Sequence, residues 1–274
     1  MNFYDTHCHP YLSKDKSQDF ILEQFFSNWG KYLNSIAVDI SSSRVSIDLA
    51  NKYPGVYATV WVHPTHCFDQ LTGYSIEETI EKLEELYHTN ISEVVAIWEC
   101  WLDYHWLESL SQQHWVSQKE VVKTQKIFFQ AQIELAKKLK LPLVIHNRES
   151  SEDIFEILQE IDFKDFVFHC FSEDLNYAQK LLAFAPKCKL WFGGIVTFKN
   201  AKNIQEVASS IPLENIIIET DSPYLTPMPH RWKEENEPLY TRCVLEKIIE
   251  LRNESPEEIE WQILKNSSIF FRRV

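Results

Sequence analysis

Histidines and carboxylates close successive apolar runs of this sequence, and side chains of these types could bind metal ions. The motif His7-Cys8-His9 ends the first run. Two-residue alternation along a strand would point both imidazoles to one face and send Cys8 the other way. Later runs end in residues of the same kind: Glu99, His146, His169 and Asp221. Imidazole and carboxylate ligands in this combination are typical of zinc, manganese or magnesium sites.

The elements that carry these residues predict that they converge. Short apolar runs alternate with longer segments of helical period, and the runs span 3–7, 34–40, 56–63, 93–99, 141–146, 166–170, 189–195 and 214–221. Strict alternation of strand and helix predicts parallel strands with helical crossovers, and hence an α/β fold of the (β/α)8 TIM barrel type. The carboxyl ends of such strands meet at one end of the barrel, the mouth, where catalytic groups gather. Four histidines and two carboxylates there predict a binuclear site for divalent cations.

The chain shows no internal repeat and no linker rich in proline or glycine, so we predict a single domain over residues 1–274. Helices are expected between the runs, for example where Ser75 and Glu78 form a capping box. Residues 105–123 form a polar excursion that we interpret as an insertion after the fourth strand. Residues 255–271 predict an additional helix at the C-terminus, with another capping box at its start.

The net charge of −13 argues against a protein that holds nucleic acid mainly through a basic surface. Any polyanion must therefore be captured locally, by metal ions or a few arginines. The first ten residues, MNFYDTHCHP, lack the basic and apolar regions of a secretory signal, and no run of 18 apolar residues occurs. We therefore expect a soluble cytoplasmic protein without membrane contact. The six cysteines are scattered, which favours reduced thiols over disulfides, and no obligate protein partner is evident.

Other residues near the predicted mouth have two interpretations each. His63 is either a substrate-binding group near the metals or a loop residue. Arg148 could clamp a phosphate with two parallel hydrogen bonds, or pair with Glu149 at the surface. Asp5 and Asp103 are either carboxylates that orient the metal ligands from behind, or strand-edge and cap residues.

Cys170 follows His169 directly, which makes it a candidate nucleophile. Strand alternation is expected to turn its thiol away from the metals, so we do not assign it that role.

With these residues the sequence resembles the TatD-type deoxyribonucleases, which are metal-dependent hydrolases of the amidohydrolase superfamily. The similarity covers nearly the whole chain. It runs through DTHCH (5–9), VHPTH (62–66), AIWECWLDY (96–104), LPLVIHNRES (141–150), FHCFS (168–172), GGIVTF (193–198), ETDSPYLTP (219–227) and NEP (236–238). The resemblance implies a TIM barrel with two divalent cations (Mg, Mn or Zn). Their ligands by resemblance are His7, His9, Glu99, His146, His169 and Asp221, with Glu99 as the bridge.

The resemblance also implies an activity, namely hydrolysis of DNA phosphodiester bonds, often from a 3′ end. Asp221 would take a proton from the attacking water, while Arg148 and His63 would hold phosphate. One alternative keeps the metals but assigns an aminoacyl-tRNA or a small amide or ester as substrate. Another alternative is an inactive barrel that serves as a binding protein.

The sequence departs from the family at positions where glycine is usual and tryptophan stands here: Trp61, Trp98, Trp101, Trp232 and, by a weaker match, Trp191. The chain holds 9 tryptophans and only 5 glycines. We hypothesise that UGA codons were translated as tryptophan where the source cell reads glycine. Trp106 and Trp261 are interpreted as genuine tryptophans, and Trp29 and Trp115 stay unassigned. The alternative is ordinary divergence, in which tryptophans fill the mouth.

Overall fold

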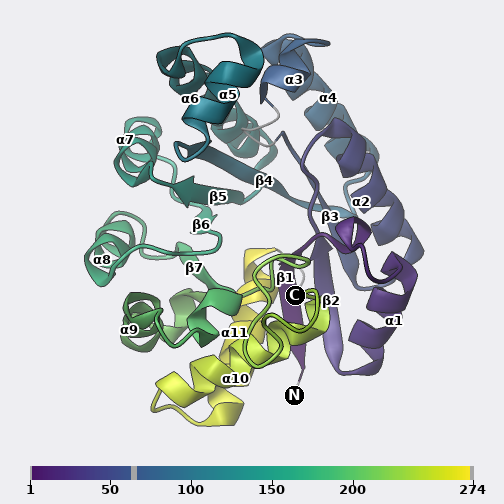
Figure 1. The fold of residues 1–274 in the computed structure, drawn as a ribbon, viewed down its shortest axis with the longest axis vertical. Coiled ribbons are helices and arrows are strands. Elements are labelled where there is room, and N and C mark those ends of the chain that lie inside the picture. Colours follow the sequence, from purple (N-terminus) through teal and green to yellow (C-terminus); the bar gives the residue numbers. More distant parts are fainter. Residues whose placement is uncertain (1, 63–66, 272–274) are drawn as a thin grey trace.

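The computed structural model describes residues 2–62 and 67–271, apart from the side chains of residues 98–101. Within these residues, eight parallel strands form one sheet in the order β1 to β8 (Figure 1). The strands are β1 (Phe3–Cys8), β2 (Gly30–Ser35), β3 (Val56–Val60), β4 (Val94–Asp103), β5 (Leu143–Arg148), β6 (Phe166–Phe168), β7 (Lys189–Phe192) and β8 (Ile216–Ile218). A parallel bridge from Cys8 to Ser222 brings the first strand beside the end of the last. The predicted barrel in a single domain is therefore confirmed as a nearly closed one.

Helices connect the strands and cover the outside of the sheet. They are α1 (Gln18–Ser27), α2 (Ile40–Lys52), α3 (Cys67–Leu71), α4 (Ile76–Thr89), α5 (Leu107–His114), α6 (Gln118–Leu139), α7 (Ser151–Ile161), α8 (Leu175–Phe184), α9 (Lys202–Ser210), α10 (Thr241–Leu251) and α11 (Pro256–Phe270). Short 3₁₀ helices lie at η1 (Pro10–Leu12), η3 (Gly194–Thr197), η4 (Leu213–Asn215) and η5 (Pro238–Tyr240). The predicted capping box at Ser75 and Glu78 starts α4. No helix of the described part of the chain is long and apolar enough to cross a membrane.

The second strand was predicted several residues too late. It spans Gly30–Ser35, whereas the apolar run suggested 34–40. The reason is the start of α2, where the Asp39 side chain accepts a hydrogen bond from the Ser42 backbone at 2.7 Å. Asp39 and Ile40, at the end of the apolar run, therefore begin α2 and do not extend the strand.

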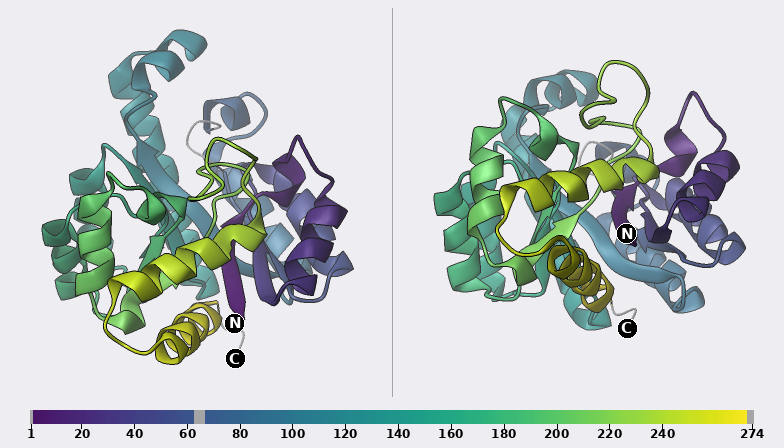
Figure 2. Two further views of the ribbon diagram at one scale, coloured as in Figure 1. Left: turned by 60° about the horizontal axis from the view of Figure 1, so that its bottom comes forward. Right: turned by 90° about the horizontal axis from the view of Figure 1, so that it is seen from below.

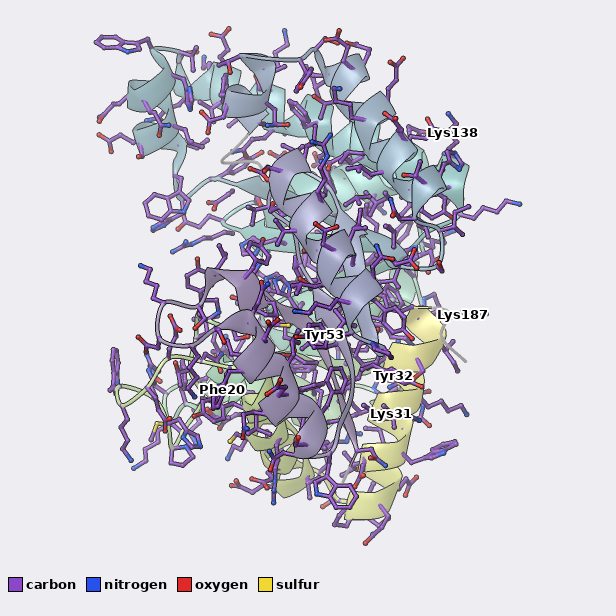
Figure 3. The ribbon with its side chains drawn as sticks, turned by 90° about the vertical axis from the view of Figure 1, so that its right-hand side faces the viewer. Phe20, Lys31, Tyr32, Tyr53, Lys138 and Lys187 are labelled. Carbon is purple, nitrogen blue, oxygen red and sulfur yellow. The ribbon has the colours of Figure 1, made fainter. Side chains whose placement is uncertain are left out.

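On the same flank, shown in Figure 3, Lys31 lies beside Tyr32 with its Nζ 5.2 Å from the ring centroid.

Apolar side chains fill the inside of the barrel, and α11 contributes to this filling. The ring of Phe271, which follows α11, lies 5.8 Å from the ring of Tyr4 and 6.0 Å from that of Trp191. Trp61 and Trp191 are both fully buried in this cluster. The predicted C-terminal helix is confirmed, and its Ser255 accepts the capping hydrogen bond from the Glu258 backbone.

The predicted insertion is not a separate loop. Residues 105–123 hold α5 and the first turns of α6, which continues without a break to Leu139. The pair of helices extends beyond the rest of the molecule in the left view of Figure 2. The excursion is thus a helical hairpin whose second helix is also the crossover from β4 to β5.

Candidate metal centre

His7 and His9 lie side by side at the end of β1 and face one carboxylate. Their Nε2 atoms are 3.1 Å apart, and Oδ1 of Asp221 lies 3.3 Å from Nε2 of His7 and 3.7 Å from Nε2 of His9. The backbone N–H of Asp221 donates to the His7 carbonyl at 2.9 Å. The alternation predicted for the two histidines is therefore present, and the backbone bond holds Asp221 against them.

A second group of ligands lies against the first. The His169 ring stacks on the His7 ring with centroids 3.9 Å apart. The His146 ring lies 5.4 Å from the His169 ring. Five of the six predicted ligands thus gather at the mouth. Glu99 belongs to β4, but its side chain lies outside the described residues.

Glu219 is a buried carboxylate at this site that the sequence reasoning missed. Its Oε2 lies 2.7 Å from Nδ1 of His169, and its Oε1 accepts from the Cys170 backbone at 2.8 Å. The same Oε2 is 3.6 Å from Nδ1 of His7. Glu219 therefore fixes ring orientations from behind, as carboxylates do for metal-binding histidines. The signal in the sequence was its place two residues before Asp221 in the run ETD.

The charges at the site suit bound cations. Burial lowers the pKa of His7 well below its usual value, and the neighbouring His169, His9 and His146 lower it further. His7 is therefore a neutral imidazole, which is the form that binds metal. Nδ1 of His9 lies 2.9 Å from the Ile36 carbonyl. Because a carbonyl only accepts, Nδ1 carries a hydrogen, and Nε2 is the nitrogen that faces Asp221.

The donor atoms fit divalent cations. Within the described residues, ligand atoms of His7, His9 and Asp221 lie within 4.8 Å of one another. The ligand atoms of His169, Cys170 and Asp221 form a second such set. Nitrogen and carboxylate donors at this spacing are the ligands that zinc and manganese take in proteins.

Asp5 and Asp103 hold backbone at the mouth. Oδ2 of Asp5 accepts from the Thr220 hydroxyl at 2.6 Å, and its Oδ1 accepts from the backbone N–H of His7 and of Thr220. Asp5 thus fastens the segment before Asp221 to β1. Asp103 accepts from the backbone of His105 at 3.0 Å and caps the turn that follows β4. Of the two interpretations, the cap fits Asp103.

Arg148 lies at the end of β5, with its guanidinium carbon 5.7 Å from the centroid of the Trp106 ring. Its side chain is exposed. Glu149, the surface partner considered for Arg148, instead has its Oε1 3.1 Å from Nδ1 of His105. Arg148 therefore stacks on Trp106, and the considered surface pair with Glu149 is not formed in the described residues. His63, the other predicted phosphate-binding residue, lies outside the described residues.

The expectation for Cys170 was wrong. Its thiol lies within 4.8 Å of ligand atoms of both His169 and Asp221. Strand alternation does not apply, because β6 ends at Phe168 and Cys170 has a left-handed backbone with φ of 47°. The turn of the chain brings the thiol to the site.

Three of the tryptophans at expected glycine positions are described and occupy different places, whereas the side chains of Trp98 and Trp101 lie outside the described residues. Trp61 lies inside the barrel, where its Nε1 donates to the Ala37 carbonyl at 2.5 Å. Trp191 packs edge-on against His7 and His169, with ring centroids 6.1 Å and 6.0 Å away. Trp232 is 87% exposed in the segment after β8. They do not share one location at the mouth, so filling of the mouth does not account for all of them.

Glu219→Gln is expected to weaken cation binding roughly 10- to 100-fold, because the amide no longer orients His169 and His7 as the carboxylate does. Titration calorimetry of metal-free protein with Mn²⁺ or Zn²⁺ measures the effect. Glu173→Gln is the matched control, since Glu173 accepts from Asn147 and Ser151 beside the mouth. Equal affinities of the Glu219 variant and the unmodified chain would contradict the assigned role.

Comparison with known proteins adds independent findings. The family model described as TatD related DNase matches residues 4–272. The chain is 34% identical over 272 residues to the uncharacterized metal-dependent hydrolase YabD of Bacillus subtilis, with 98% of each chain covered. It is 33% identical over 285 residues to an uncharacterized metal-dependent hydrolase of Mycoplasma genitalium, with 99% of each covered. The crystal structure of the TatD homologue YJJV from Escherichia coli superposes with a TM-score of 0.84 at 25% identity, covering 98% of each chain.

Proposed function

We propose that this chain, which belongs to the TatD related DNase family and is similar to proteins named metal-dependent hydrolases, hydrolyses DNA phosphodiester bonds from a 3′ end. The observation that carries this proposal is the Asp221 carboxylate beside the Nε2 atoms of His7 and His9 at the barrel mouth. A carboxylate beside metal-binding imidazoles supports this proposal, because it could hold and deprotonate an attacking water.

In the proposed mechanism two divalent cations would be held by His7, His9, Glu99, His146, His169 and Asp221. Such cations would supply a water of lowered pKa and would stabilise charge on a phosphoryl oxygen. Asp221 would accept the proton of the attacking water, because its carboxylate lies beside His7 and His9 and keeps partial access to solvent. Glu219 and the Ile36 carbonyl keep the rings of His169 and His9 in place.

DNA would be held locally, which agrees with the net charge of −13. Arg148 and His63 are the proposed phosphate-binding groups. We propose no obligate protein partner and no membrane contact. We propose a cytoplasmic location. It is supported by the cysteines of the described residues that form no disulfide, namely Cys8, Cys67, Cys170, Cys188 and Cys243.

Arg148→Ala is expected to raise KM for an oligonucleotide roughly 10- to 100-fold with little change in kcat, since a charge-assisted hydrogen bond to phosphate contributes about 1.5–3 kcal/mol. Steady-state kinetics on a single-stranded oligonucleotide measure both constants. Arg242→Ala is the control, because Arg242 pairs with Glu246 on α10. An unchanged KM for the Arg148 variant would remove this residue from the substrate site.

The substrate class is tested by comparing two substrates under one metal condition. We expect turnover of a 3′-labelled oligonucleotide to exceed that of an aminoacyl ester by a wide margin. Preferential turnover of the ester would replace the nuclease proposal with the aminoacyl alternative. Turnover of neither substrate would favour a binding protein.

A further inference from the structure

We propose that the Cys170 thiolate is itself a ligand of the second cation and gives that position a preference for zinc over magnesium. The proposal deepens the proposed function, since it concerns the same metal centre. Cys170, His169 and Asp221 each offer a ligand atom, and these atoms lie within 4.8 Å of one another. Asp221 also belongs to the set with His7 and His9, so the two sets meet at one carboxylate.

The backbone around Cys170 is built to hold its thiol in this place. Its left-handed φ of 47° is a conformation that residues other than glycine adopt at a cost, and such residues gather at functional sites. Oε1 of Glu219 accepts from the Cys170 backbone at 2.8 Å, while Oε2 lies 2.7 Å from Nδ1 of His169. One buried carboxylate therefore fixes both neighbouring donors.

The chemistry of the donors sets the metal preference. A soft thiolate selects zinc or cobalt, whereas magnesium prefers oxygen ligands. Cys8 cannot be the thiolate ligand, because its thiol donates to the Asn34 carbonyl at 3.3 Å on the other face of β1. The second position would thus combine sulfur, nitrogen and oxygen, and the first would use nitrogen and oxygen alone.

Cobalt absorption tests this assignment without any substrate. Loading the metal-free chain with Co²⁺ is expected to give a near-ultraviolet sulfur-to-cobalt charge-transfer band, which Cys170→Ser and Cys170→Ala lose and Cys243→Ser keeps. Cys170→Ser should also lower the preference for Zn²⁺ over Mg²⁺ in competition titrations. A band that persists in both Cys170 variants, or its absence in the unmodified chain, overturns the assignment. A normal band without DNA cleavage would instead overturn only the proposed function.

A separate observation concerns three exposed tryptophans, and from it we infer that positions 29, 115 and 232 carry glycine in the protein made by its own cells. The backbone φ is 75° at Trp29, 56° at Trp115 and 71° at Trp232. This left-handed region suits glycine and costs a side-chain-bearing residue about 1–2 kcal/mol. The three side chains are 66%, 94% and 87% exposed, so burial offsets little of that cost.

Two of the positions are also ones where helices commonly end in glycine. Trp115 is the C-terminal cap of α5, and Trp29 follows Asn28, the C-terminal cap of α1. Tryptophan accounts for three of the nine non-glycine residues with positive φ in the described chain, although it is 9 residues of 274. By contrast, Trp106 has a φ of −97° and Trp261 lies within α11. One codon read as tryptophan in place of glycine explains this division and extends the hypothesis to Trp29 and Trp115.

Tandem mass spectrometry of protein purified from its own cells tests the inference directly. Peptides that cover positions 29, 115 and 232 should have the mass of glycine there, and peptides that cover 106 and 261 the mass of tryptophan. Tryptophan at the first three positions overturns the inference. In the chain as printed, Trp115→Gly should raise the urea midpoint of unfolding and the control Trp261→Gly should lower it. A lower midpoint for Trp115→Gly would show that position 115 is not a glycine position.

Discussion

Asp221→Asn is expected to lower kcat for phosphodiester hydrolysis by a factor of roughly 10² to 10⁴, the usual loss when a positioned general base is removed. Asparagine keeps the shape of the side chain but cannot accept the proton of the attacking water. It also removes the negative charge that lies 3.3 Å from Nε2 of His7. Both effects act at the metal centre, because Asp221 is also one of the proposed cation ligands.

The backbone allows this substitution to be interpreted cleanly. Asp221 has a φ of 58°, a conformation that asparagine tolerates as well as aspartate does. Its N–H bond to the His7 carbonyl is unaffected by the change. The measurement is kcat at saturating oligonucleotide and fixed cation concentration, with Asp48→Asn on the exposed side of α2 as the control. A kcat within a few-fold of the unmodified value would exclude Asp221 as the base.

Removal of divalent cations is expected to abolish turnover and to destabilise the chain. The centre gathers buried imidazoles and carboxylates whose arrangement suits cations, so a bound cation stabilises the folded state. At a free concentration one hundred times its Kd, a cation adds about 2.7 kcal/mol to the free energy of unfolding. Thermal unfolding and oligonucleotide cleavage, measured before and after dialysis against a chelator, give the two effects.

Return of the cation should restore both properties. The control is the same chelator saturated with Mn²⁺ before use, which leaves the protein loaded. Full activity of a chain shown by elemental analysis to be free of metal would contradict metal dependence of the reaction.

Much of the fold could be predicted because alternation of strand and helix admits few topologies. Each buried apolar run contributes to a strand of the sheet, so all eight predicted strands overlap the observed ones, the second only at residues 34–35. The second strand was predicted too late because the Asp39 cap, and not the apolar pattern, determines where α2 begins after β2. A local hydrogen bond thus outweighed hydrophobicity.

The candidate site could be predicted only as far as strand geometry holds. His7 and His9 follow alternation along β1, so their side chains were placed correctly. Cys170 and Asp221 lie beyond the ends of their strands in left-handed conformations, where alternation no longer orients a side chain. The role of Glu219 depends on contacts with His169 and Cys170, which are far from it in sequence, so it became visible only in the folded chain.

Metal-dependent cleavage of DNA is the central claim, and one titration tests it most directly. Metal-free protein is mixed with a 5′-labelled single-stranded oligonucleotide while Mn²⁺ or Zn²⁺ is added in steps. We predict that shortened products appear when the cation is added. The rate of cleavage should level off at about two cations per chain, as a binuclear site requires. An oligonucleotide that stays intact although calorimetry shows the cations bound would contradict the claim.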